Sequence, residues 1–464
     1  MIGVESIGVW IPLYRLNRKE IFESVGWIGK SFAPGERTVA NFDEDAITMA
    51  VNAAMQCDYS GVDAVFFAST TMPYSERQNA AVIASALDLP SHVLTSDFSG
   101  STKAVSSAII AALNLIKSGG AKRVLVCASD CRMGKVGGYA EVAYGDAAAA
   151  VVIGEPKFAT IDDYYSLSFD FMDSWRIDRD RFAKFWEDRW VKDEGYKRFI
   201  PEAIYNLLNQ SGTKAGDVSA VGYPCLYIRD YARVCAPLGF SKEKLLDPLF
   251  ETVGNTGNPH ILLMLAVALS SLNTGSRLVL ATYGSGSDAF MLTVTGNTSL
   301  SPLFNRKKSI SYEKYLAFKE MVPVEKGIRG EEVATTAVSV LWRDRREILG
   351  LVGSRCKSCG VPQYPAQGIC VACGSQDMEP YRFADKRGFI FSFTEDYLAY
   401  SANPPAMYGL VDFEGGGRFW FDFTDCEPGE LKVGDPVRMS FRRKDFDTRR
   451  RIYNYFWKAV LEVK

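Results

Sequence analysis

The chain has 464 residues, of which 47% are hydrophobic and 23% are charged, and 53 basic and 55 acidic residues give a net charge of −2. This composition is typical of a folded globular protein and excludes wholesale disorder. The near-neutral balance gives no general attraction to nucleic acid or membranes, so we expect neither as a partner. The apolar stretches at 104–116 and 261–272 are too short to span a bilayer, and the first residues lack signal-peptide features. We therefore expect a cytoplasmic protein.

Residues 1–300 alternate between strand-like and helix-like segments. Runs rich in β-branched, aromatic and small apolar residues predict strands at 64–68, 123–128, 147–153, 220–223 and 278–282. Apolar residues spaced three and four apart predict helices at 45–55, 79–87, 103–117 and 260–272. This alternation predicts a layered α/β fold. The small-residue segments at 145–152 and 284–290 have similar composition and both lead into β-rich runs, which indicates two related halves.

The pattern changes after residue 300. Residues 301–349 are rich in charge, and we expect a helical linker there with an amphipathic helix at 311–321. A cysteine cluster occupies 350–380, and residues 381–464 contain short strand-like runs at 389–394, 408–413, 418–423, 436–441 and 452–463. Strands at this spacing predict a small β-barrel. The basic runs at 442–444 and 449–451 favour a solvated hairpin, or a contact to the phosphates of a ligand or to a partner, over nucleic-acid binding.

Four of the ten cysteines form one closely spaced cluster. Cys356, Cys359, Cys370 and Cys373 give two C-x2-C pairs separated by ten residues, and each pair is followed by glycine. Four thiolates arranged in this way bind one Zn²⁺ tetrahedrally and close its coordination shell. We therefore expect a zinc ribbon with a structural metal. The other cysteines are scattered, and no disulfide framework is expected.

Several segments of residues 1–320 are similar to archaeal-type 3-hydroxy-3-methylglutaryl-CoA synthases, which belong to the thiolase superfamily. The similar segments are GVWIPLYR at 8–15, DEDA at 43–46, DSWR at 173–176, VGNTG at 253–257 and YGSGSDAF at 283–290. The resemblance implies a thiolase-like αβαβα domain over 1–300, a coenzyme A (CoA) thioester as substrate and a homodimer. Residues 350–464 resemble zinc-ribbon/OB-fold proteins that accompany thiolases and these synthases, through GFIFSFT at 388–394, NPP at 403–405 and VGDPV at 433–437. The expected fold class is thus α/β, thiolase-like, followed by a zinc ribbon and an OB-fold barrel.

The catalytic residues of the family are replaced in this sequence. The family uses a cysteine that carries the acyl group, a glutamate acid/base and a histidine. Matching its motifs to STKAVSSAI at 101–109, STTMPY at 69–74 and YPCLY at 223–227 places Thr102, Thr70 and Pro224 at those positions. A threonine hydroxyl without an adjacent base does not replace a thiolate, so standard synthase chemistry is not expected. Thr102 and Thr70 either take part in altered chemistry or fill the vacated space.

Two hypotheses follow. The first is an acyl-CoA-dependent C–C bond enzyme of the aldol/retro-aldol or acyl-transfer type, because an aldol step needs only an acid/base and donors to the thioester oxygen. The resemblance points the same way, since some zinc-ribbon-associated thiolase-like proteins are aldolases that use tyrosine. Tyr227 and His260 are then candidate acid/base groups, and Asn255 is a candidate oxyanion donor together with the amides at 284–286.

Arg176 and Arg229 either contact the CoA phosphates or have a plain surface role, and the resemblance places Arg229 at a basic CoA contact of the family. The second hypothesis is a noncatalytic scaffold subunit that docks a separate thiolase and channels its acyl-CoA. Acid/base groups facing an open tunnel would favour the enzyme. A tunnel plugged beside Thr102 would favour the scaffold.

Overall fold

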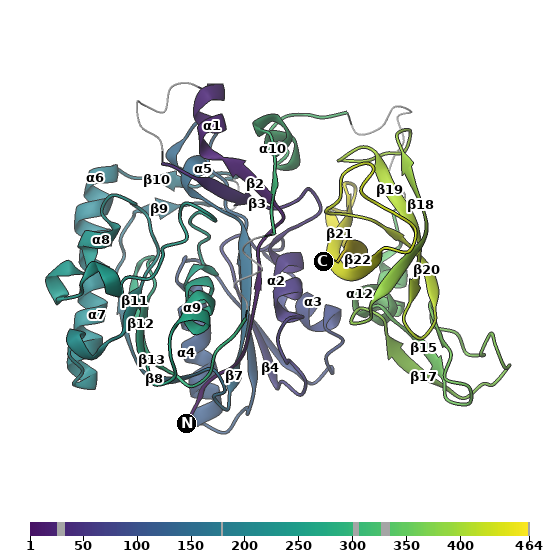
Figure 1. Cartoon of the computed structure of the whole chain (residues 1–464), viewed down its shortest axis with the longest axis horizontal. Coiled ribbons are helices and arrows are strands. Elements are labelled where there is room, and N and C mark those ends of the chain that lie inside the picture. Colours follow the sequence, from purple (N-terminus) through teal and green to yellow (C-terminus); the bar gives the residue numbers. More distant parts are fainter. Residues whose placement is uncertain (26–32, 178–179, 300–305, 326–334, 463–464) are drawn as a thin grey trace. The chain divides into compact units, whose positions relative to one another are not determined.

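The computed structural model describes residues 1–25, 33–177, 180–299, 306–325 and 335–462 (Figure 1). It divides into two compact units. Unit 1 comprises Met1–Ala40, Asn52–Ala81 and His92–Tyr315, and unit 2 comprises Asn41–Val51, Val82–Ser91 and Leu316–Lys464. Parts of the predicted linker, 301–305 and 326–334, lie outside the described residues, as does residue 463 of the last predicted strand. Within the described ranges, no helix combines the length and apolar character needed to cross a membrane.

Unit 1 is built on a nine-stranded sheet in the order β11-β12-β13-β8-β1-β7-β6-β4-β5. In each half a parallel pair, β4–β6 or β11–β12, is followed by an antiparallel strand, β7 or β13. The halves join where β1 pairs with β8. The small-residue segments that indicated two related halves begin β7 and β13. The strands are β1 (Gly3–Trp10), β4 (Ala64–Ala68), β5 (Leu94–Phe98), β6 (Val124–Asp130), β7 (Ala147–Gly154), β8 (Ala159–Ser168), β11 (Ala220–Gly222), β12 (Arg277–Ala281) and β13 (Gly286–Val294).

Helices cover both faces of the β11–β8 half of this sheet. Along β12, Leu278 and Leu280 belong to the core that contains α4 (Ala104–Lys117) and α9 (His260–Ser271). The alternate residue Val279 belongs to the core that contains α7 (Lys197–Ser211). Period-two alternation between two apolar layers is expected for a strand buried on both faces. Figure 1 shows α7 outside these strands and α4 and α9 on their other side.

Shorter elements complete unit 1. β2, β3 and β14 form a three-stranded sheet, and β9 and β10 form a two-stranded hairpin. Helices α2, α3 and α10 are each divided between the two units. The bounds are β2 (Tyr14–Asn17), α1 (Arg18–Val25), β3 (Glu36–Val39), α2 (Ala46–Ala54), α3 (Asn79–Ala86), α5 (Tyr139–Ala143), β9 (Ser174–Trp175), β10 (Lys184–Phe185), α6 (Asp188–Trp190), α8 (Tyr231–Val234), β14 (Lys308–Ser309) and α10 (Tyr312–Phe318).

Unit 2 contains a three-stranded ribbon and a five-stranded antiparallel barrel sheet in the order β20-β19-β18-β21-β22. A bridge between Phe423 and Ala459 brings the two edges together. All five predicted barrel strands are present. The elements are α11 (Val338–Arg343), α12 (Arg345–Gly350), β15 (Val352–Cys356), β16 (Pro362–Gln363), β17 (Met378–Arg382), β18 (Gly388–Asp396), β19 (Ala406–Phe413), β20 (Arg418–Asp422), β21 (Pro436–Asp447) and β22 (Ile452–Leu461).

The expectation of a solvated basic hairpin at 442–444 is wrong for Arg442. β21 continues through this segment to Asp447, and the Arg442 side chain is fully buried. The reason is a set of carboxylates that surround its guanidinium and are described below.

Candidate functional site

A cavity of about 700 Å³ lies in unit 1 beside Thr102, two residues before α4 begins. Its walls come from α5, from the β9–β10 hairpin and from the loops that follow β11 and β12. Seven aromatic side chains dominate the lining, which is typical of sites for largely apolar ligands. They are Tyr139, Tyr144, Trp175, Phe185, Trp186, Tyr227 and Tyr283.

Thr102 lines the cavity, but its hydroxyl is bound to the main chain. Thr102 Oγ1 donates a hydrogen bond of 2.7 Å to the carbonyl oxygen of Tyr283. A Cβ added at Gly284, where φ is +152°, would lie 2.4 Å from that hydroxyl oxygen, so the close approach requires glycine. The hydroxyl proton is therefore directed to a peptide oxygen and not to a base. No cysteine lines the cavity within the part of the chain that the structure describes.

Asn255 lines the same cavity with its amide held in one orientation. Its Oδ1 accepts hydrogen bonds from Arg132 Nη2 at 2.7 Å and from the Gly257 amide at 3.1 Å. The Arg132 guanidinium is itself fixed over the Tyr144 ring, 3.9 Å from the centroid. Because the amide oxygen is used in this way, Nδ2 is the part of the Asn255 side chain that can donate a hydrogen bond.

Asp173 and Tyr283 are two titratable side chains of the cavity wall that the sequence did not single out. Asp173 is 7% exposed, and its Oδ1 accepts a 2.6 Å hydrogen bond from the Ser174 amide. Burial raises the pKa of Asp173 above its ordinary value. Burial, followed by the charge of Asp173, raises the pKa of Tyr283. A raised pKa makes the Asp173 carboxylate a stronger proton acceptor, while the Tyr283 phenol keeps its proton at neutral pH and can donate a hydrogen bond.

Tyr227, a predicted acid/base group, also lines the cavity. Its ring stacks on Tyr139 with centroids 6.4 Å apart, and its hydroxyl donates to the Asp188 carbonyl at 3.4 Å. Burial raises the pKa of Tyr227, so its hydroxyl also stays protonated at neutral pH. Thr102, Asn255 and Tyr227 are thus brought together from three separate segments.

The other predicted residues lie apart from the cavity lining. His260 is the first residue of α9 and is fully buried, with Nδ1 3.2 Å from Thr256 Oγ1. Burial lowers the pKa of His260 to about 4, so its ring is neutral near pH 7. Thr70 donates from its amide and its hydroxyl to Asp130 Oδ1, at 2.7 and 2.9 Å.

The two arginines predicted to contact CoA are both exposed. Arg176 Nη2 donates a 2.6 Å hydrogen bond to the carbonyl oxygen of Thr70. Neither Arg176 nor Arg229 is among the described residues that line the cavity. Arg176 directly follows β9, and Arg229 lies in the loop after β11. Both segments supply other residues to the cavity wall.

The four ribbon cysteines converge in unit 2. Their sulfur atoms all lie within 4.8 Å of one another. Cys356 Sγ is 3.6 Å from Cys373 Sγ, and Cys359 Sγ is 3.5 Å from Cys370 Sγ. Four thiolates at the usual Zn–S bond length of about 2.3 Å are separated by about 3.8 Å in a regular tetrahedron, so these sulfurs fit one zinc ion. A four-cysteine shell has no open position, and the zinc is structural.

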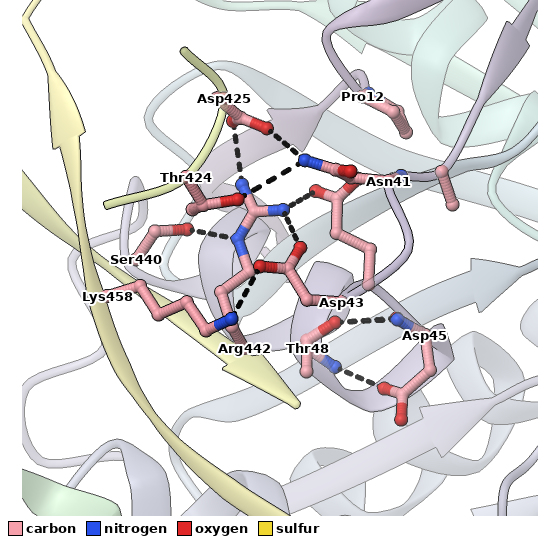
Figure 2. Close-up of polar contacts among 12 residues, drawn as sticks. Pro12, Asn41, Asp43, Asp45, Thr48, Thr424, Asp425, Ser440, Arg442 and Lys458 are labelled. Carbon is pink, nitrogen blue, oxygen red and sulfur yellow. Dashed lines mark hydrogen bonds and ion pairs between the residues drawn. The ribbon is translucent and has the colours of Figure 1, made fainter. Parts of the chain in front are cut away.

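Unit 2 also contains a buried cluster of charges around Arg442 (Figure 2). Arg442 Nη1 lies 3.0 Å from both Asp43 Oδ1 and Glu44 Oε1, and Nη2 lies 2.7 Å from Asp425 Oδ2. Lys458 Nζ lies 3.1 Å from Asp43 Oδ2. Two cations therefore face three carboxylates. The cluster joins the segment 41–51 to barrel strands that follow it by almost 400 residues.

The sheet order and the paired helices α4 and α9 define a thiolase-like fold. In solved structures the fold matches an HMG-CoA synthase complexed with CoA, with a TM-score of 0.63, 20% identity, and coverage of 72% of this chain and 94% of that chain. It also matches 3-oxoacyl-(acyl carrier protein) synthase III from Pseudomonas aeruginosa PAO1, with a TM-score of 0.58, 20% identity, and coverage of 64% and 98%.

Sequence comparison identifies the family. The chain is 30% identical over 307 residues to the hydroxymethylglutaryl-CoA synthase of Aeropyrum pernix, covering 63% of this chain and 85% of that protein. It is 29% identical over 348 residues to the corresponding protein of Caldivirga maquilingensis, covering 70% and 99%. The chain belongs to the hydroxymethylglutaryl-CoA synthase family.

The C-terminal part matches two further family models. Residues 343–379 match the rubredoxin-like zinc ribbon domain of ChsH2, and residues 381–442 match the C-terminal OB-fold domain of ChsH2. The predicted resemblance, fold class and zinc ribbon are confirmed.

Proposed function

We propose that this chain is an enzyme that makes or breaks a C–C bond of an acyl-CoA thioester by aldol or retro-aldol chemistry, without a covalent acyl-enzyme. The observation that carries the proposal is the composition of one cavity. Thr102, which our motif alignment places at the position of the family's nucleophile, donates its hydroxyl hydrogen bond to a carbonyl oxygen, whereas Asp173, Tyr283 and the Asn255 amide line the same space. Membership of a family named for a CoA-dependent synthase supports a CoA thioester as substrate.

In the cleavage direction, the Asp173 carboxylate accepts the proton of the substrate's β-hydroxyl group. The bond between the α- and β-carbons breaks, its electron pair forms the thioester enolate, and the β-carbon becomes the carbonyl of an aldehyde or ketone. The α-carbon then takes the proton back from Asp173. Atoms and electrons balance without an oxidant or reductant, and condensation is the same sequence in reverse.

The other cavity residues stabilise charge. The Asn255 Nδ2 group donates to the thioester oxygen as negative charge develops on it, and such oriented donors contribute about 10²- to 10³-fold to rate in comparable sites. The protonated hydroxyl of Tyr283 donates to the substrate's β-oxygen beside Asp173. The Tyr227 hydroxyl already donates to the Asp188 carbonyl, so Tyr227 contributes its ring to the wall. Arg176 and Arg229 remain our candidates for the CoA phosphates, on a homodimer.

The alternative of a noncatalytic scaffold that channels the acyl-CoA of a separate thiolase does not need this cavity. A space of about 700 Å³ beside Thr102, with titratable groups in its wall, favours the enzyme.

The test uses the full chain and a panel of 3-hydroxyacyl-CoA thioesters, with products followed by liquid chromatography and mass spectrometry. We expect shortened acyl-CoA and a carbonyl product from the wild type. The rate should fall by about 10²-fold or more in D173N and to a smaller extent in Y283F. The exposed residues Asp170 and Tyr205 provide the matched controls D170N and Y205F, which should keep the wild-type rate. A wild-type rate in D173N, or no turnover across the panel, would contradict the proposal.

A further inference from the structure

We infer that the acyl group taken by this cavity has a bulky apolar body carrying a ring, and that the β9–β10 hairpin supplies the surface against which this body packs. The inference rests on the proposed function in one respect, since it takes the cavity as the acyl site. It concerns the size and polarity of the substrate and not the reaction.

The hairpin presents aromatic side chains that the protein itself leaves uncovered. Trp175, Phe185 and Trp186 all line the cavity, yet Phe185 is 44% exposed and Trp186 is 58% exposed. Large apolar side chains gathered around a concave surface are characteristic of ligand sites. The ring of Phe185 also lies 6.1 Å from that of Tyr144, so the aromatic surface continues from the hairpin onto the residue that follows α5.

Main-chain hydrogen bonds hold the two strands of the hairpin together and connect it to a neighbouring loop. The Trp186 amide donates to the Asp173 carbonyl at 3.1 Å, and the Ala183 amide donates to the Met133 carbonyl at 3.2 Å. Lys184 and Trp175 are cross-strand partners in the two-stranded sheet. The exposed faces of the Phe185 and Trp186 rings are therefore available to a ligand.

The aromatic wall begins next to the reacting group. Asp173 immediately precedes β9, and a substituent on the carbon that bears the hydroxyl must lie near this carboxylate during proton transfer. The substituent then meets Trp175 and the rings beyond it. A polar substituent would lose hydration against these rings without gaining partners, whereas an apolar ring would exchange water for aromatic contact.

The size of the cavity points in the same direction. A volume of about 700 Å³ lies within the range of sites that bury ligands of drug size. An acetoacetyl group has four carbon atoms and is much smaller than this volume. A ring-bearing acyl group covers this wall.

Binding separates this inference from the reaction. Isothermal titration of the full chain would compare butyryl-CoA with 3-cyclohexylpropanoyl-CoA and naphthylacetyl-CoA, which lack a β-hydroxyl group and cannot be cleaved. We expect the two ring-bearing thioesters to bind at least tenfold more tightly than butyryl-CoA. In F185A and W186A that ratio should fall toward one. The variant W420A removes a tryptophan of similar exposure (49%) from the barrel and should retain the ratio.

Equal affinity for butyryl-CoA and the ring-bearing thioesters would overturn the inference, and so would unchanged ratios in F185A and W186A. Circular dichroism would check that F185A and W186A are folded. We expect that they are, because the Phe185 and Trp186 side chains are exposed. If ring-bearing thioesters bind selectively but their 3-hydroxy derivatives are not cleaved, the proposed function fails and the inference stands. If short 3-hydroxyacyl-CoAs are bound and cleaved best, the inference fails and the proposed function stands.

Discussion

Replacing Glu44 by glutamine should remove a pH dependence from the stability of unit 2. Glu44 Oε1 lies 3.0 Å from Arg442 Nη1, and Oε2 accepts a 2.8 Å hydrogen bond from the Asn41 amide. The pKa of Glu44 is raised to about 7. Burial is the largest cause, and the charges of Asp425 and Asp43 act in the same direction, whereas the attraction of Arg442 and the hydrogen bond from the Asn41 amide act against it. With two cations and three carboxylates in the cluster, one bound proton makes the buried charges balance.

The magnitude follows from linkage between proton binding and folding. A rise in pKa from 4.5 to about 7 corresponds to about 3 kcal/mol, because each pKa unit is worth about 1.4 kcal/mol. The unfolded chain releases this proton near pH 4.5 and the folded chain near pH 7. The stability that the protonated group contributes is therefore complete below pH 4.5 and is lost as the pH rises through 7. E44Q mimics the protonated form, so its advantage over the wild type should grow with pH, to as much as about 3 kcal/mol at pH 8.

Hydrogen exchange measured by mass spectrometry on peptides from β21 and β22 reports the opening free energy of this part of unit 2. Exchange would be followed from pH 5 to pH 8 and corrected for the intrinsic rate. E414Q changes an exposed glutamate of the same unit and should follow the wild type at every pH. A difference between E44Q and the wild type that is the same at pH 5 and pH 8 would refute the reasoning.

Three further outcomes are expected. R442M should lower the free energy of unfolding of unit 2 by about 3–5 kcal/mol, measured by urea denaturation, because it leaves buried carboxylates without their cation; an unchanged midpoint would contradict this. C359S should reduce bound zinc from one atom per chain to less than half, measured by plasma mass spectrometry, while C426S, at a buried cysteine outside the cluster, should retain it. G284A should lower the melting temperature more than G275A. A Cβ at residue 284 would lie 2.4 Å from the Thr102 hydroxyl oxygen, whereas nothing lies within 4 Å of a Cβ at residue 275. Equal losses would show that the close contact at residue 284 is relieved without cost.

The sequence indicated the architecture well because the relevant signals are local. Period-two and helical spacings placed the predicted strands and helices within a few residues of their observed bounds, but β1, β5, β8 and the long helix α7 were not predicted. The cysteine spacing alone located the ribbon. The end of β21 was missed because a run of three basic residues favours solvent, and the carboxylates that bury Arg442 include Asp43 and Glu44, which lie almost 400 residues earlier.

The candidate site was only partly accessible to sequence reasoning. Thr102 and Asn255 stand at motif positions, and the structure places both in the cavity wall. Asp173 lies in the quoted DSWR segment, but a single aspartate carries no spacing signal, and its importance arises from burial beside Tyr283. His260 follows Asn255 closely in sequence, but it begins a helix whose first turn points its ring into the interior.

The most direct test of enolate chemistry without an acyl-enzyme is turnover in deuterated water with a ring-bearing 3-hydroxyacyl-CoA. One mass-spectrometric measurement would follow both the acyl-CoA product and the intact protein. We expect one deuterium at the α-carbon of the shortened acyl-CoA, because the hydroxyl proton that Asp173 returns has exchanged with solvent, and we expect an unmodified protein mass throughout. A protein mass increased by the acyl group, or a product without deuterium at the α-carbon, would contradict this chemistry.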